Sequence, residues 1–367
     1  MRGMWPRTRP LWALCTLPAC QAPQADTSPF PPTPPVTMQA TSSTSSSTGD
    51  PGGSSSTGGS SESSSTTGGW STTSTGEDGS TTLLLDVGSD VDLGDGKPVG
   101  CQGKIDFLFV ISRYAGMTGF QGRLLDAFPK FIHTIQTKFA DFDYHIMVVD
   151  GGPSWGASLC EQECPVPCIP DYPCDYEPSQ CDMTLGAGVV FPAGNNTGNE
   201  PCSIDGGHRY MVKGQTDLDG TFACAARVGT SGKAMMGQAL ATAVQPWLNG
   251  PGDCNDGFLR EDALLMVTVI TNTYDGEGWI VCSQNGDPET WTTALRTAKA
   301  DDLGSIVVLG ILPTEGPGCD KDDRICQMLE FFPYALNRDI AADDYGPFFD
   351  EATDLVETAC AGFIAPG

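Results

Sequence analysis

Long apolar runs in the C-terminal two thirds of the chain restrict its fold more than any other feature. They are DFLFVI (106–111), HIMVV (145–149), ALLMVTVIT (263–271) and SIVVLGIL (305–312). Continuous apolar runs of this length are typical of strands buried on both faces of a parallel sheet. Segments with apolar residues at helical spacing separate them. This alternation predicts an α/β fold, in which a Rossmann-like parallel sheet, mixed at its edge, is flanked by helices.

The expected elements follow the chain in order from residue 104. Strands are predicted at 104–111, 144–149, 262–271 and 305–313, and helices at 119–139, 235–248, 289–300, 324–336 and 348–363. Between residues 151 and 224 the pattern gives way to Cys, Pro, Gly and Asn. We interpret this segment, called the Cys-rich insertion below, as a disulfide-rich lobe with short strands at 188–191 and 209–212.

The N-terminus resembles an export signal. Residues 1–19 combine basic arginines, a short apolar run and a small residue before Cys20, which predicts a signal peptide. The sequence LPAC (17–20) resembles the lipobox of bacterial lipoproteins, and that resemblance implies lipidation of Cys20. Because Gln21 follows the cysteine, the same resemblance implies an outer-membrane or cell-surface destination. The alternative is a plain cleaved signal.

Residues 20–99 are predicted to be a disordered tether. Positions 41–80 alone contain 16 Ser, 9 Thr and 9 Gly, which leaves little apolar surface to bury. The domain prediction is therefore a signal peptide at 1–19, a tether at 20–99 and a folded domain at 100–363. Only a lipid anchor would join the chain to a membrane, because no other apolar run approaches the ~20 residues that span a bilayer.

Charge and cysteine content narrow the partners and the compartment. The net charge of −27 argues against nucleic acid, whose binding requires clustered Lys and Arg. Of the 15 cysteines, 13 lie between Cys101 and Cys360, and in an exported chain they predict disulfides with at least one cysteine left over. A zinc or iron–sulfur site at Cys160, Cys164, Cys168, Cys174 and Cys181 is the weaker alternative, because paired C-x-x-C spacing is lacking.

Four phrases, DFLFVI, YHIMVVD, RVGTSG and ALLMVTVIT, together with the order of the elements, resemble a von Willebrand factor A-type domain. The resemblance covers residues 100–363 and is to the Cys-rich version found on exported bacterial lipoproteins. In that family a D-x-S-x-S loop after the first strand, a Thr from a middle loop and an Asp after a later strand form a metal-ion-dependent adhesion site. Such a site needs oxygen ligands and negative charge, because hard divalent cations prefer them.

Mapped onto this chain, the adhesion-site positions have lost their carboxylates. They are Ser112, Tyr114, Gly116, Thr230 and Asn272. Arg113 adds a positive charge where a cation would bind, which opposes metal binding. We therefore expect a degenerate site with no cofactor. The alternative is residual Mg²⁺ or Ca²⁺ binding through neutral oxygens of Ser112, Thr230 and Asn272, with Asp275 moving inward.

No enzyme motif stands out in the sequence. GTSGKA (229–234) departs from the phosphate-binding loop at both of its ends, and the three histidines lie away from any recognisable nucleophile motif. We expect a non-enzymatic, metal-independent module for protein binding or adhesion, with an unknown protein or envelope ligand as partner. Its candidate binding surface is Arg113, Tyr114, Met117 and Phe120. The other class considered is a purely structural envelope lipoprotein, which burial of Tyr114, Met117 and Phe120 under the Cys-rich insertion would favour.

Overall fold

The computed structural model describes residues 103–156, 171–275, 282–314 and 322–362. The signal peptide, Cys20 and the tether lie outside these ranges. The strands are β1 (Lys104–Ile111), β2 (Asp143–Asp150), β3 (Met211–Val212), β4 (Leu264–Ile270), β5 (Ile306–Leu312) and β6 (Tyr334–Asp339). The α-helices are α1 (Thr118–Lys138), α3 (Leu218–Ala226), α4 (Met236–Ala243), α5 (Pro246–Asn249), α6 (Pro288–Ala298), α7 (Arg324–Leu329) and α8 (Gly346–Gly362), and 3-10 turns occupy Asp205–Gly207 and Leu303–Ser305.

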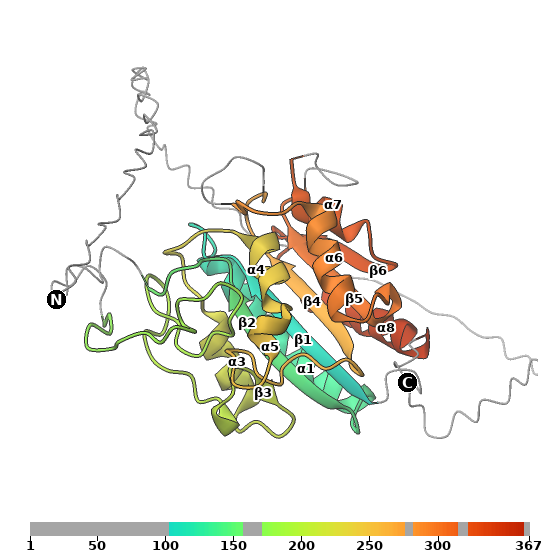
Figure 1. Cartoon of the computed structure of the whole chain (residues 1–367), viewed down its shortest axis with the longest axis horizontal. Coiled ribbons are helices and arrows are strands. Elements are labelled where there is room, and N and C mark those ends of the chain that lie inside the picture. The colour runs from blue at the N-terminus through green and yellow to red at the C-terminus, as the bar shows by residue number, and fades with distance from the viewer. Residues whose placement is uncertain (1–102, 157–170, 276–281, 315–321, 363–367) are drawn as a thin grey trace, which may run out of the picture. The chain divides into compact units, whose positions relative to one another are not determined.

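The six strands form one sheet in the order β3-β2-β1-β4-β5-β6 (Figure 1). All neighbouring strands are parallel except β3, which pairs antiparallel with β2 at the edge. Parallel strands joined by helices that cover both faces are the arrangement that the apolar runs predict. The α/β Rossmann-like fold with a mixed edge is therefore confirmed.

Helices cover both faces of the sheet and create two apolar layers. On one face, α1, α3 and α8 pack over an aromatic cluster, in which the rings of Phe128 and Phe222 stack with centroids 3.5 Å apart. On the other face, α4, α6 and α7 enclose Trp291, which is 1% exposed. These layers make the sheet a rigid support for the loops at its ends.

The strand order reverses between β1 and β4, which makes this position the topological switch point of the sheet. The two strands are adjacent, with Ile111 opposite Ile270, although about 150 residues separate them. The backbone N–H of Ser112 extends the pairing by donating to the carbonyl of Ile270 at 2.9 Å. In open α/β sheets, ligands bind outside the carboxyl ends of the strands at such a point.

Two predicted helices differ from the observed elements because of prolines. The segment 235–248 is divided into α4 and α5, since Pro246 lacks an N–H and begins a new helix at its first turn. The segment 324–336 is helical only to Leu329. Pro333 follows soon after, and the chain then continues as the half-exposed edge strand β6.

The Cys-rich insertion also differs from the prediction in its details. Residues 188–191 form no strand, although Val189 donates one hydrogen bond to the carbonyl of Val148 in β2. The predicted strand at 209–212 is reduced to β3. The last residues of the insertion belong to the helix α3 and pack on the main domain. The side chain of Phe222 in α3 is fully buried in the main core.

Candidate functional site

The loop that leaves β1 is closed by hydrogen bonds within the protein. Ser112, to which the resemblance assigns the Asp position of the adhesion site, is fully buried, and its hydroxyl oxygen accepts the N–H of Tyr114 at 3.1 Å. Its carbonyl accepts from the side-chain amide of Gln121 at 3.2 Å. The same amide reaches the carbonyl of Gly229 at 3.0 Å, so Gln121 joins the two loops of the site. The site's first oxygen position is thus engaged by the chain itself.

Gln121 is a residue of the candidate site that the sequence interpretation missed. It is 3% exposed and lies on the face of α1 that also buries Leu124 and Phe128. A polar residue on the apolar face of an amphipathic helix must find hydrogen-bond partners, because burial of an unpaired amide is unfavourable. That signal was present in the sequence.

The end of β4 is fastened to the same loop. The side-chain amide of Asn272 donates to the carbonyl of Ala115 at 2.9 Å. The neighbouring Gly116 has a φ of +89°, and a Cβ at that residue would lie 3.1 Å from the Asn272 amide nitrogen. Gly116 is therefore required by a left-handed backbone and by close contact, which is a physical reason for the absence of a serine.

Thr230, the one family position that keeps its residue type, is engaged by the Cys-rich insertion. Its hydroxyl oxygen accepts from the side-chain amide of Asn196 at 2.8 Å, and its backbone N–H donates to the carbonyl of Asn195 at 2.9 Å. Thr230 is half-buried, whereas Asn195 and Asn196 are exposed. Groups of Asn195 and Asn196 thus engage both the backbone and the hydroxyl of Thr230.

Arg113 is not on the surface, contrary to the prediction. It is 2% exposed, and its guanidinium donates to the carbonyls of Ser154, Gly156 and Ala193 at 2.5, 2.9 and 3.2 Å. It also forms an ion pair with Asp150 at 3.3 Å. Burial raises the pKa of Asp150, and the positive charge of Arg113 opposes that rise. Arg113 therefore fastens the Cys-rich insertion to the carboxyl end of β1 and β2.

The other three residues of the predicted surface divide between core and rim. Met117 is fully buried because the chain turns inward just before α1 begins, so its inclusion in the surface was wrong. Tyr114 and Phe120 are half-buried, and the residues between them other than Met117 are exposed. The guanidinium of Arg123 lies 5.3 Å from the Phe120 ring centroid. What remains exposed is a rim made of Tyr114, Ala115, Gly116, Thr118, Gly119 and Phe120, none of which carries charge.

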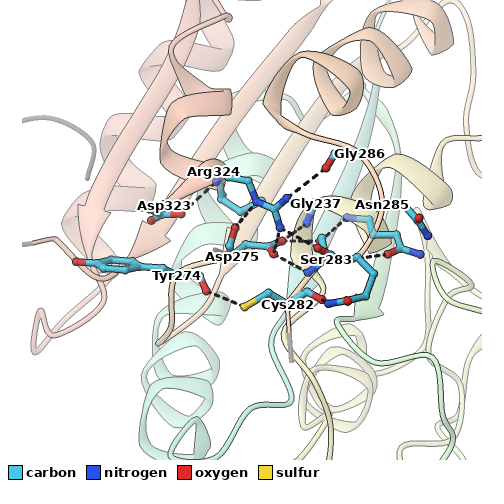
Figure 2. A network of polar contacts seen from close by, with 12 residues as sticks. Gly237, Tyr274, Asp275, Cys282, Ser283, Asn285, Gly286, Asp323 and Arg324 are labelled. Carbon is cyan, nitrogen blue, oxygen red and sulfur yellow. Dashed lines mark hydrogen bonds and ion pairs between the residues drawn. The ribbon is translucent and has the colours of Figure 1, made fainter. Parts of the chain in front are cut away.

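Asp275, the alternative metal ligand, is committed to a different network (Figure 2). Its carboxylate accepts from the N–H groups of Gly237 and Ser283 at 2.9 and 2.7 Å and from the Ser283 hydroxyl at 2.6 Å. Arg324 adds an ion pair at 3.2 Å. Asp275 is fully buried, and all these contacts would have to break before it could move inward. The network joins the first turn of α4 to α7 and contains no histidine.

Disulfides confirm the oxidative interpretation of the cysteines that the structure describes. Cys181 pairs with Cys254, in the segment between α5 and β4, and Cys202 pairs with Cys224 in α3. Cys174, Cys326 and Cys360 are disulfide-bonded as well. Cys282 is buried, and its sulfur donates to the carbonyl of Tyr274 at 3.2 Å. Cys160, Cys164 and Cys168 lie outside the described residues.

A second polar cluster lies at the opposite, amino end of the sheet. Asp106, fully buried in β1, forms an ion pair with Arg260 at 2.7 Å, and burial raises its pKa to about 6. His145 donates to the carbonyl of Phe258 at 2.9 Å, and burial lowers its pKa to about 4. An imidazole with this pKa is neutral near pH 7, and its hydrogen bond to a backbone carbonyl gives His145 a structural role.

Across 103–156, 171–275, 282–314 and 322–362, no group of three or more His, Cys, Asp or Glu side chains could bind a metal ion. In the same ranges no helix has the length and apolar character to cross a bilayer.

The fold and the site define an α/β protein with a Rossmann-like mixed sheet and a closed loop cluster at its switch point. No family model and no curated protein matches the chain. A solved structure of proximal thread matrix protein 1 from the mussel byssus has a TM-score of 0.33 and 14% identity, over 71% of this chain and 47% of that chain. The pilus adhesin SpaC of Lactobacillus rhamnosus GG, in an open conformation, has a TM-score of 0.34 and 10% identity, over 69% and 30%. This chain thus spans less than half of either protein, and a likeness of this degree carries no argument about function.

Proposed function

We propose that this chain is an exported, non-enzymatic module of the von Willebrand factor A type, which binds a partner protein at the carboxyl edge of its sheet without a metal ion. One observation carries the proposal. At the switch point, two oxygens that would bind a cation accept hydrogen bonds from the chain itself, the Ser112 hydroxyl from Tyr114 and the Thr230 hydroxyl from Asn196, and the Asn272 side chain is fixed by the bond that its amide N–H donates to Ala115. The buried charge of Arg113 lies in the same loop.

Because the adhesion-site positions at the carboxyl edge of the sheet lack carboxylates, this edge suits a partner that makes direct apolar and hydrogen-bonded contacts. Its exposed part is the uncharged rim of residues 114–120 together with Asn195 and Asn196. Half-buried aromatic side chains beside backbone and amide groups are typical of protein-binding surfaces, where Tyr and Phe supply apolar contact at low entropic cost. We therefore propose direct contact between protein surfaces in place of the metal-bridged contact of the family.

The non-enzymatic part of the proposal rests on the placement of the reactive groups. His145 is neutral near pH 7 and bonded to a backbone carbonyl at the far end of the sheet. Ser283, which donates to Asp275, has a carboxylate but no imidazole beside it. Nucleophilic catalysis of the Ser-His-Asp type needs a base within reach of the nucleophile, and neither group supplies one.

Export and surface display form the remaining part of the proposal. Disulfides persist in oxidising compartments, and the bonds of Cys181 and Cys202 support an extracytoplasmic location. The lipidation of Cys20 and the tether lie outside the described residues and stay predictions. Mass spectrometry of the mature N-terminus would test them, since an unmodified start beyond Cys20 would remove the lipid anchor.

A crosslinking experiment tests the proposed binding edge. A photo-reactive amino acid at Thr118 is compared with one at Thr137, because both are exposed threonines of α1 at its two ends. In an envelope fraction of the native host containing EDTA, Thr118 should give a defined crosslinked product and Thr137 should not. Ala115→Glu should abolish that product, while Ala361→Glu in α8 should leave it unchanged.

The structural alternative is favoured by one observation, the burial of Arg113 and Met117. It predicts equal crosslinking from Thr118 and Thr137. A product that forms from Thr118 only in the absence of EDTA would instead contradict the metal-independent part of the proposal.

A further inference from the structure

An aromatic pocket in the Cys-rich insertion is separate from the edge of the sheet and is used by nothing described above. Its volume is about 370 Å³, a size that suits a single side chain or small ligand. The lining residues that matter here are Trp155, Tyr172, Tyr176, Met183, Asp175 and Glu177. Ring centroids of Tyr176 and Tyr172 lie 5.0 and 6.0 Å from that of Trp155. Trp155 is 5% exposed and packs against both tyrosines, which are half-buried and present the aromatic surface of the pocket.

The aromatic wall is fixed before any ligand binds. The indole N–H of Trp155 donates to the carbonyl of Phe191 at 2.8 Å, and the Tyr176 hydroxyl donates to Asp182 at 2.9 Å. Gly156 has a φ of +66°, and a Cβ there would lie 2.4 Å from the Tyr172 hydroxyl oxygen. Glycine therefore lets the Tyr172 side chain lie against the backbone. A prearranged wall reduces the entropy lost on binding.

The rim of the pocket is acidic and open to solvent. Asp175 and Glu177 are both exposed. Met183 is 42% exposed and is one of three large apolar side chains that protrude from the described part of the chain. Aromatic faces attract cations through their quadrupole, and carboxylates at the rim add charge complementarity. The net charge of −27 also attracts a basic ligand over a longer range.

We propose that this pocket binds an arginine side chain of a partner protein. A guanidinium is planar, stacks on aromatic faces such as those of Tyr172 and Tyr176, and pairs with carboxylates through a rigid fork of N–H donors, which a lysine ammonium lacks. The proposal goes beyond the proposed function, because the pocket shares no residue with the rim of residues 114–120. Its failure would leave the crosslinking result at Thr118 untouched.

The test is titration of the full chain with a labelled, end-blocked peptide, Gly-Arg-Gly-Arg-Gly, followed by fluorescence anisotropy. The matched control peptide replaces each arginine by citrulline, which has nearly the same shape but no charge. We expect saturable binding of the arginine peptide and at least about tenfold weaker binding of the citrulline peptide, in line with a cation stacked on aromatic rings and paired with carboxylates.

Two variants and one control locate the binding. Tyr172→Ala and the double variant Asp175→Asn with Glu177→Gln should each weaken binding about tenfold. The double control, Glu330→Gln with Asp343→Asn, removes the same charge at exposed positions outside the pocket and should change it less than about twofold. The carboxylate variant keeps the test decisive if Tyr172→Ala does not fold, because both of its positions are exposed.

Three results would overturn the proposal. They are the absence of saturable binding, equal binding of the citrulline peptide, which would indicate a neutral ligand, and an equal loss in the control variant, which would indicate attraction by net charge alone.

Discussion

The side-chain amide of Asn272 donates to the carbonyl of Ala115 at 2.9 Å and joins the ends of β4 and β1 across the switch point. In the von Willebrand factor A-type family that the sequence resembles, a cation bridges the loops to which the resemblance assigns Ser112 and Asn272. Here one neutral hydrogen bond makes the connection, and Gln121 makes a second one to the loop at Gly229. The closed site therefore depends on specific side chains and on a specific backbone conformation, and substitutions can test each of them.

Gly116→Ala should destabilise the protein. The substitution introduces a Cβ 3.1 Å from the Asn272 amide at a residue with a φ of +89°, and such strain costs on the order of 1 to 2 kcal/mol. Denaturant unfolding would measure it. Gly119→Ala is the control: it lies in α1 with nothing within 4 Å of an added Cβ, so it should be neutral or slightly stabilising. Equal stabilities for the two variants would contradict the close contact.

Arg113→Met should loosen the Cys-rich insertion. It removes the donors to Ser154, Gly156 and Ala193 and leaves the Asp150 carboxylate without its ion pair, with an expected loss of roughly 3 kcal/mol. Limited proteolysis should then cut the insertion early. Arg227→Met, at an exposed arginine, is the control. If both variants resist protease equally, Arg113 does not fasten the insertion.

The two described disulfides should have different local effects. Cys181 and Cys254 are 73 residues apart and Cys202 and Cys224 are 22 apart, so chain entropy predicts losses of roughly 4 and 3 kcal/mol when each pair is replaced by alanine. Without the first pair, hydrogen exchange should rise in 171–200 while the sheet stays protected. Without the second, exchange should rise around α3, whose Phe222 packs in the core. Unchanged exchange near the missing bond in either variant would contradict this assignment.

His145 should make stability fall in acid. Its folded pKa of about 4 lies below its ordinary value of 6.5, so the unfolded chain binds more protons between these pH values and is favoured as the pH falls. His145→Asn removes that group. The unfolding free energy of the variant minus that of wild type should therefore increase by roughly 2 to 3 kcal/mol as the pH falls from 7 to 4.

Taking the difference between the two proteins cancels groups that they share. Asp106 is one of these shared groups, and its carboxylate lies 3.7 Å from the His145 ring. Because the folded state raises the pKa of Asp106, protonation of this carboxyl stabilises the folded protein as the pH falls, which is opposite to the effect of His145. Denaturant titrations at several pH values give the comparison. A difference that does not change with pH would show that His145 titrates alike in both states.

The sequence predicts those elements whose pattern is local. The predicted and observed limits of β1 are the same, Lys104–Ile111, because the apolar run from Phe107 to Ile111 is typical of a buried strand. The prediction of one helix from 324 to 336 was wrong, because the apolar residues of α7 and of the edge strand β6 follow each other closely along the chain. Only Pro333 marks the boundary between the two elements. The short helix α3 was hidden by the Cys and Gly content around it.

The candidate site was predictable in position but not in detail. Ser112 and Asn272 do lie beside each other, because both follow adjacent parallel strands. The burial of Arg113 was not predictable, since three of its partners are backbone carbonyls 41 to 80 residues away, and a backbone carbonyl is not encoded by residue type. Met117 was misplaced because an apolar residue before a helix can face either the core or the solvent.

The most direct test of the account is thermal unfolding with and without millimolar Mg²⁺, Mn²⁺ or Ca²⁺. A functional site of micromolar affinity would add about 4 kcal/mol at these concentrations and raise the Tm by several degrees. A variant that restores the family's ligands, Ser112→Asp with Tyr114→Ser and Asn272→Asp, should show such a shift. Gly116 stays unchanged in it, because its φ of +89° favours glycine. Wild type and Thr230→Ala should both show none. A shift of several degrees in wild type that disappears in Thr230→Ala would contradict the account and show a working metal site at this edge.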